Sequence, residues 1–110
     1  MNQTSAPYPS DVSEFEMAGL TPIASELIRP ARVKESPVSF ECKLYKSVLV
    51  GEEKAGSSMM YIGEVVRFHV REDLYSEGRI DIERLQPVGR LAGTGYCHVN
   101  NLFDLQTPVL

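Results

Sequence analysis

The chain has 110 residues and a mass of 12.3 kDa, and a domain of this size buries roughly two thirds of the surface of its unfolded chain. Hydrophobic residues make up 43% and charged residues 24% of the sequence, which excludes a disordered or fibrous chain. The net charge is −4 and the basic residues are scattered singly, which excludes the concentrated basic face of a nucleic-acid-binding protein. We therefore expect one domain over residues 1–110.

The sequence predicts neither a membrane span nor a secretory leader. No apolar run approaches the roughly 20 residues that cross a bilayer, and Met1–Ser10 is polar, without the apolar centre of a signal peptide. We expect a cytoplasmic protein with no membrane partner. Cys42 and Cys97 are too few and too far apart for a disulfide scaffold or a zinc site, so reduced, packed thiols are favoured over a disulfide.

A short helix is predicted near the N-terminus. Ser10 and Asp11 can cap it, Glu14 follows Asp11 at the spacing of a capping box, and Gly19 supplies a stop. The next segment, residues 20–37, contains three prolines and is therefore predicted to be an extended connector.

The strongest pattern in the sequence predicts an antiparallel hairpin. Residues 38–50 alternate apolar and polar side chains, which indicates a half-buried strand. Residues 51–58 are polar and glycine-containing, as in a hairpin loop, and residues 59–70 form the return strand. The apolar positions expected to face inward on the first strand are Phe40, Cys42 and Leu44.

Two residues inside the return strand have more than one interpretation. Gly63 indicates a bulge, a bend of the strand or a close approach by another backbone or ligand, because glycine otherwise weakens a strand. The bend is slightly favoured. Glu64 is either an outward, solvated carboxylate or a partner for Arg67 or Arg90, and the solvated reading is the more common one.

The C-terminal part is turn-rich. Residues 71–78 are charged and turn-like, and residues 81–85 predict one helical turn that Asp81 caps and that ends before Pro87. The stretch 89–95 holds three glycines in seven residues, so it predicts a loop followed by a short segment, residues 97–105. Its backbone N–H groups could cradle a phosphate, but the ending of a P-loop is missing and a plain connection is favoured.

Side chains with catalytic chemistry are sparse. His69 and His98 are far apart, without neighbours at metal-ligand spacing. Neither histidine lies beside a serine or cysteine in a pattern that indicates a nucleophile and its base. We expect no metal and no catalytic side chain, so the residues by themselves predict a β-rich binding scaffold.

Several segments nevertheless resemble, in order and spacing, the flavin reductase-like family of FMN-binding split β-barrel proteins. The resemblance covers almost the whole chain. The matching segments are Asn2–Pro9, Glu14–Pro22, Glu35–Leu44, Ile62–Val66, Gly78–Asp81, Leu85–Leu91 and Gly95–Tyr96.

This resemblance implies a mainly β fold, a split β-barrel with short helices. It also implies FMN at the interface of a homodimer, with NAD(P)H as reductant and either flavin reduction or electron transfer to an acceptor protein. The flavin would supply the redox chemistry, and the protein would position it. The resemblance implies cofactor-binding roles for Asn2, Thr4, Ser5, Arg90, Gly93 and Tyr96.

The sequence departs from the family in two respects. Relatives often carry a histidine before the Gly-Glu-Val-Val stretch, where this chain has Ser57–Tyr61. Relatives also begin with additional strands that hold much of the FMN phosphate, so this chain resembles the C-terminal portion of the domain and an incomplete barrel. The alternative to an active enzyme is therefore a truncated, non-catalytic flavin-binding or dimerisation module. Its open strand edges would favour self-association.

Overall fold

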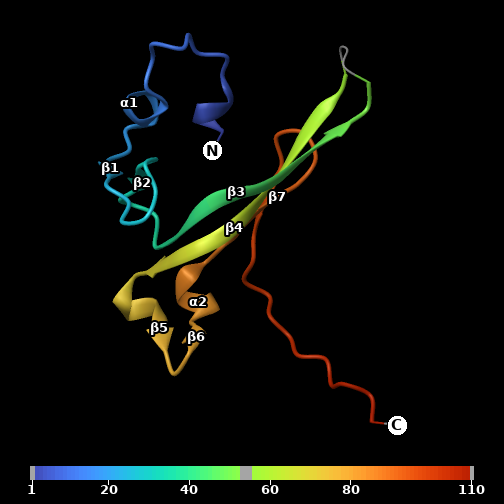
Figure 1. Ribbon diagram of the computed structural model, residues 1–110. Coiled ribbons are helices and arrows are strands. Elements are labelled where there is room, and N and C mark those ends of the chain that lie inside the picture. The colour runs from blue at the N-terminus through green and yellow to red at the C-terminus, as the bar shows by residue number, and fades with distance from the viewer. Residues whose placement is uncertain (1, 53–55, 110) are drawn as a thin grey trace. The chain divides into compact units, whose positions relative to one another are not determined.

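The computed structural model describes residues 2–52 and 56–109 and is mostly β with a few short helices, as predicted (Figure 1). It forms two compact units, Met1–Val70 and Arg71–Leu110, which are described separately below. The single domain over residues 1–110 stays a prediction. In the described residues, no helix is long and apolar enough to cross a membrane.

The first unit consists of a small N-terminal region followed by one long hairpin. The strands pair antiparallel, β1 with β2 and β3 with β4. The elements of this unit are η1 (Gln3–Ser5), α1 (Glu14–Ala18), β1 (Pro22–Ile23), β2 (Arg32–Val33), β3 (Val38–Val50) and β4 (Ser58–Val70).

Helix α1 ends where the sequence predicts but begins later. Gly19 adopts a left-handed conformation with φ of 65°. The N–H groups of Gly19 and Leu20 donate to the carbonyls of Glu16 and Phe15, and this pair of hydrogen bonds is that of a Schellman motif. The predicted cap at Ser10 and Asp11 is wrong, because those residues lie in a turn that the N–H of Val12 closes onto Pro9. Ser13 is the N-cap instead.

The predicted extended connector folds back on itself. Pro22 pairs with Val33 and Ile23 pairs with Arg32. The fold-back is held at its base because the carboxylate of Glu35 accepts the N–H of Thr21, at 3.0 and 3.1 Å. The prolines correctly predicted extended backbone in β1 and β2. The reversal of the chain between the two strands is held by the contact between Glu35 and Thr21.

The long hairpin is confirmed. Strands β3 and β4 pair from Val38 opposite Val70 to Val50 opposite Ser58, and residues 53–55 of the predicted loop lie outside the described residues. Two register shifts interrupt the ladder, one between Glu41 and Cys42 and one between Leu44 and Lys46. Such shifts bend a strand and increase its twist.

Gly63 lies opposite Leu44, beside the second of these shifts. A Cβ atom at Gly63 would stand 3.2 Å from the Cβ atom of Cys42, which is closer than ordinary side-chain contact. The structure therefore shows a bulge beside Gly63, and the close contact there is with the side chain of Cys42. Glu64 is exposed opposite Lys43.

The predicted burial of the first strand is wrong. Phe40 is 54% and Leu44 is 67% exposed, whereas Glu41 is completely buried. Alternation places neighbouring residues on opposite faces, and the residues around Glu26 and Leu27 contact the face that carries Glu41. Within the described part of the unit, the aromatic face is left open.

The second unit is built from short elements around Leu74, which is 1% exposed. Leu74 also accepts the N–H of Asp81 through its carbonyl, at 2.8 Å, which joins the start of the unit to its second helix. The elements are η2 (Glu72–Leu74), β5 (Tyr75–Ser76), β6 (Arg79–Ile80), α2 (Ile82–Leu85), β7 (Val88–Arg90) and β8 (Tyr96–His98).

The predicted helical turn at Asp81 is confirmed. The carboxylate of Asp81 accepts the N–H of Arg84 at 3.0 Å, as an N-cap residue does. Asp81→Ala is expected to destabilise this unit by about 1 kcal/mol, because the N–H of Arg84 loses its partner. Asp81→Asn should retain most of the stability, since asparagine caps equally well. Urea unfolding of the two variants measures the difference, and equal losses in both would contradict the capping role.

The glycine-rich stretch is more regular than predicted. Strand β7 includes Gly89 and Arg90, which pair with Cys97 and Tyr96 of β8, so the loop is reduced to residues 91–95. A Cβ atom at Gly89 would stand 3.0 Å from the Sγ atom of Cys97. Glycine at this position thus permits close strand pairing, a reason that the glycine count alone does not reveal. The predicted segment over residues 97–105 forms a strand only to His98.

Candidate functional site

The N-terminal candidates lie together in one turn. Thr4 and Ser5 belong to η1, and Asn2 directly precedes it. The hydroxyl of Ser5 donates to the carbonyl of Asn2 at 2.7 Å, and its N–H donates to the same carbonyl. The structure therefore brings these three polar residues into a single local cluster.

Thr4 also lines a pocket of about 270 Å³, together with Phe15, Leu20 and Val33. The apolar side chains come from helix α1, the residue after its glycine stop, and strand β2. Glu14 adds a carboxylate to the same lining. This pocket joins one predicted site residue to apolar walls of the kind that small-molecule sites use.

The C-terminal candidates lie on the β7–β8 hairpin. Arg90 and Tyr96 are directly opposite each other in the ladder, so their side chains share a face. Gly93 lies in the connecting loop with φ of 62°, which favours glycine there. The N–H of Leu91 donates to the carbonyl of Gly95 at 2.9 Å and closes the loop.

The side chains of this hairpin differ in chemistry. Arg90 offers a fork of donors that suits anionic groups, and Tyr96 offers a planar ring with a hydroxyl. Within the described residues, the guanidinium of Arg90 makes no hydrogen bond or ion pair. Arg90 is thus available to a ligand. The N-terminal candidates belong to the first unit, and Arg90, Gly93 and Tyr96 belong to the second.

A buried polar cluster of the first unit surrounds Glu41. The alternation of the first strand predicts Glu41 on the outward polar face. Its carboxylate accepts the N–H of Glu26 at 2.8 Å and the N–H of Leu27 at 2.7 Å. His69 Nε2 lies 2.7 Å from Glu41 Oε1, and Arg32 Nε lies 3.9 Å from the same oxygen. Glu41 thus fastens the β1–β2 segment to the long hairpin.

One part of this cluster could have been predicted. In the observed register, Ser39 faces His69, so His69 is diagonal to Glu41 and comes within reach once this register is given to the predicted hairpin. The two amide donors could not have been predicted, because they come from a turn with no side-chain signature.

The environment of Glu41 favours its charged form. Burial raises the pKa of the carboxyl, but the N–H groups of Glu26 and Leu27 and the contact with His69 outweigh burial and lower the pKa to about 2. A lowered pKa means that the folded state stabilises the charged carboxylate more than the protonated carboxyl. Glu41 therefore stabilises the first unit as a carboxylate.

Acid should weaken the first unit through this residue. The pKa falls from 4.5 to about 2 on folding, so the contribution is complete above about pH 4.5 and disappears as the pH falls toward 2. Thermal unfolding followed by circular dichroism should show a decline in stability over this range. The decline should be smaller in Glu41→Gln, which has no carboxyl to titrate. A decline of the same size in the variant would contradict the assignment.

A second pocket, of about 490 Å³, lies beside this cluster and is lined in part by Ser25, Arg32, Ser39 and Cys42. Arg32 donates through Nη2 to the carbonyl of Ala24 at 3.1 Å, and its Nε is buried without a hydrogen-bond partner. Because Glu41 stands 3.9 Å from that nitrogen, the carboxylate offsets the charge of Arg32. This pocket is therefore a poor site for an anion.

The remaining candidate chemistry stays dispersed. Cys42 and Cys97 are both free thiols. In the described part of the chain, no group of three histidine, cysteine or carboxylate side chains could hold a metal. The carboxylate partner of Arg67 is Glu26, and Glu64 is exposed, as the favoured prediction has it. The candidate ligand-binding groups thus stay the turn at Asn2–Ser5 and the β7–β8 hairpin.

The sequence profile of the flavin reductase like domain matches residues 1–87. Among curated relatives, protein BH2278 of Halalkalibacterium halodurans is 37% identical over 111 residues, which cover 100% of this chain and 53% of the relative. YwrF of Bacillus subtilis is 33% identical over 111 residues, which cover 98% of this chain and 54% of the relative. The chain thus spans about half the length of these relatives.

Solved structures agree with the profile. Nitrilotriacetate monooxygenase component B from Bacillus cereus is 44% identical, with a TM-score of 0.87 over 94% of this chain and 52% of that protein. A structure from Shewanella frigidimarina, described as a flavin reductase with a split barrel domain, is 30% identical, with a TM-score of 0.78 over 97% of this chain and 53% of that one. Flavoredoxin of Desulfovibrio vulgaris is 25% identical, with a TM-score of 0.71 over 91% of this chain and 52% of that one.

The names of the family profile, of the Shewanella frigidimarina structure and of flavoredoxin refer to flavin. The family profile covers more than half of the chain. The chain therefore belongs to the flavin reductase-like domain family.

Proposed function

We propose that this chain contributes to an FMN-binding oxidoreductase that takes electrons from NAD(P)H and reduces free flavin or passes electrons to an acceptor protein. The observation that carries the proposal is the 44% identity and TM-score of 0.87 to nitrilotriacetate monooxygenase component B. A component of a monooxygenase works with a partner, which agrees with an acceptor protein. We also propose a homodimer, and cytoplasmic location.

We propose cofactor contacts for each candidate group, taken by itself. Arg90 would bind an anionic part of the flavin, Gly93 would allow its loop to approach closely, and Tyr96 would lie against the ring system. Asn2, Thr4 and Ser5 would add polar contacts from the N-terminal turn. The donor set fits a flavin, since a guanidinium without a protein partner and an aromatic ring share one face of the β7–β8 hairpin.

FMN would supply the hydride and electron transfer, because no protein nucleophile is needed for that chemistry. The residues of this chain would hold the cofactor in place and limit access of water to it. The Glu41 cluster would keep the β1–β2 segment fixed on the hairpin. None of these roles requires a side chain to exchange a proton with the substrate.

Titration of the purified chain with FMN tests the proposal. Binding should quench flavin fluorescence, and the complex should then oxidise NAD(P)H, followed by the loss of nicotinamide absorbance. Riboflavin, which lacks the phosphate, is the matched control ligand and should bind more weakly. Failure to bind FMN would contradict the proposal.

The second candidate function is a flavin-binding or dimerisation module without turnover. The observation that favours it is that the chain covers 52% of the monooxygenase component, so about half of that protein has no counterpart in the match. Flavin binding without NAD(P)H oxidation would support this module, and measurable turnover would exclude it.

A further inference from the structure

The pocket of about 490 Å³ beside the Glu41 cluster has both apolar and polar walls. Its lining comes from the segment that contains β2 and from the start of β3, all within the first unit. The volume is in the range of small-molecule sites. Ile28, Val33 and Phe40 supply apolar surface, and the ring of Phe40 is 54% exposed. The pocket therefore has room for the apolar body of a small ligand.

Arg32 supplies hydrogen-bond donors to the same pocket. A guanidinium carries five N–H groups. Within residues 2–52 and 56–109, the guanidinium of Arg32 makes one hydrogen bond, from Nη2 to the carbonyl of Ala24 at 3.1 Å, and its Nε has no hydrogen-bond partner. The side chain is only 18% exposed. Because unpaired polar groups are costly when they are largely withdrawn from water, Arg32 favours a ligand with an acceptor oxygen.

The charge of the pocket is balanced. Oε1 of Glu41 lies 3.9 Å from Nε of Arg32, so the carboxylate offsets the positive charge there. Glu41 already accepts the N–H groups of Glu26 and Leu27. A carboxylate or phosphate of a ligand would approach the negative charge of Glu41 and lose its own hydration. The acceptor that suits Arg32 is therefore uncharged, such as a carbonyl oxygen.

Two serines supply acceptors. The hydroxyl of Ser25 donates to the carbonyl of Pro30, and the hydroxyl of Ser36 donates to the carbonyl of Val38 at 2.7 Å. A serine hydroxyl has one proton and two lone pairs. Since both protons are used within the protein, these two hydroxyls offer only acceptor lone pairs to the pocket that they line. They suit a ligand N–H.

We infer that this pocket binds an uncharged carboxamide with an apolar, ring-containing body. The carbonyl oxygen accepts from Arg32, and the amide N–H donates to a serine oxygen. The body packs against Ile28, Val33 and Phe40. Flavin and nicotinamide nucleotides carry phosphates that the charge-balanced pocket does not compensate, so the ligand is a molecule separate from the proposed cofactors. The inference does not depend on whether flavin binds.

The test titrates the full chain with benzamide, without flavin, and follows the backbone amide signals by NMR. Saturable shifts are expected at the lining residues Ser36, Ser39 and Cys42. Acetophenone has a similar shape and a carbonyl but no N–H, and it should bind about fivefold more weakly, as for the loss of one hydrogen bond. Benzoate has the same ring and a negative charge, and it should bind at least about tenfold more weakly.

A variant tests the donor. Arg32→Lys keeps the charge beside Glu41 but loses the planar fork of donors, so it should weaken benzamide binding at least about fivefold. Arg29→Lys is the matched control, because Arg29 is exposed and does not line the pocket, and its affinity should stay within about twofold. The amide signals of Glu26 and Leu27 report the contact with Glu41 and should be unchanged in both variants.

The inference is overturned if benzamide gives no saturable shifts at the lining residues, or if benzoate binds as tightly as benzamide. It is also overturned if Arg32→Lys keeps the Glu26 and Leu27 signals and binds benzamide as tightly as the unchanged chain. If Arg32→Lys loses those signals, the comparison of the three ligands on the unchanged chain decides. Absence of FMN binding beside normal benzamide binding would contradict the proposed function alone.

Discussion

Glu41→Gln is expected to release the turn at Glu26 and Leu27 from the long hairpin. The carboxylate accepts one N–H on each oxygen, whereas a glutamine amide has only one oxygen and would point its NH₂ group at the other donor. A buried donor without a partner is costly. Burial of Glu41 is complete, so water cannot easily replace the lost bond.

Hydrogen exchange measures this effect at the two donors. We expect the protection of the Glu26 and Leu27 amides to fall at least about tenfold, since hydrogen bonds to charged groups are stronger than neutral ones. Glu64→Gln is the matched control, because Glu64 is exposed on β4 and should leave both amides unchanged. Unchanged protection in Glu41→Gln would show that the turn is held by other contacts.

Arg90→Ala is expected to weaken FMN binding by about tenfold to a hundredfold, because a hydrogen-bonded charge pair between protein and ligand commonly has an effect of that size. The FMN affinity of Arg90→Lys should lie between that of the unchanged chain and that of Arg90→Ala, since lysine keeps the charge but loses the planar fork. Fluorescence titration with FMN measures the affinity of the unchanged chain and of the two Arg90 variants.

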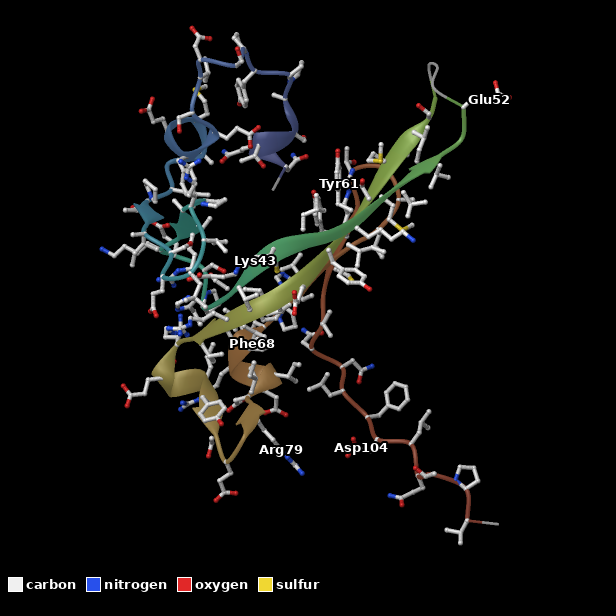
Figure 2. All side chains as sticks on the ribbon, viewed as in Figure 1. Lys43, Glu52, Tyr61, Phe68, Arg79 and Asp104 are labelled. Carbon is white, nitrogen blue, oxygen red and sulfur yellow. The ribbon has the colours of Figure 1, made fainter. Side chains whose placement is uncertain are left out.

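The control for this series is Arg79→Ala. Arg79 is exposed on β6 in the same unit (Figure 2), so its removal changes the net charge equally without touching the β7–β8 hairpin. We expect its FMN affinity to stay within about twofold of the unchanged chain. If both arginine variants weaken binding by the same factor, the effect is one of overall charge and Arg90 is not a contact.

Local signals in the sequence predicted the candidate site only in part. The family resemblance grouped Arg90, Gly93 and Tyr96, whereas the glycine-rich stretch alone favoured a plain connection, and the β7–β8 ladder places Arg90 opposite Tyr96. The cluster around Glu41 was missed. Its donors lie 14 and 15 residues away, and backbone N–H groups carry no residue-specific signal.

The sequence by itself determined the elements whose causes are local. Alternation produced the hairpin of β3 and β4, Asp81 capped α2, and Gly19 ended α1 through a left-handed residue. Only the tertiary structure decided which face of the hairpin is covered. The alternation marks two faces without saying where a neighbour packs, and here the β1–β2 segment covers Glu41 because its amides satisfy the carboxylate. Phe40 and Phe68 lie on the other face and stay 54% and 65% exposed.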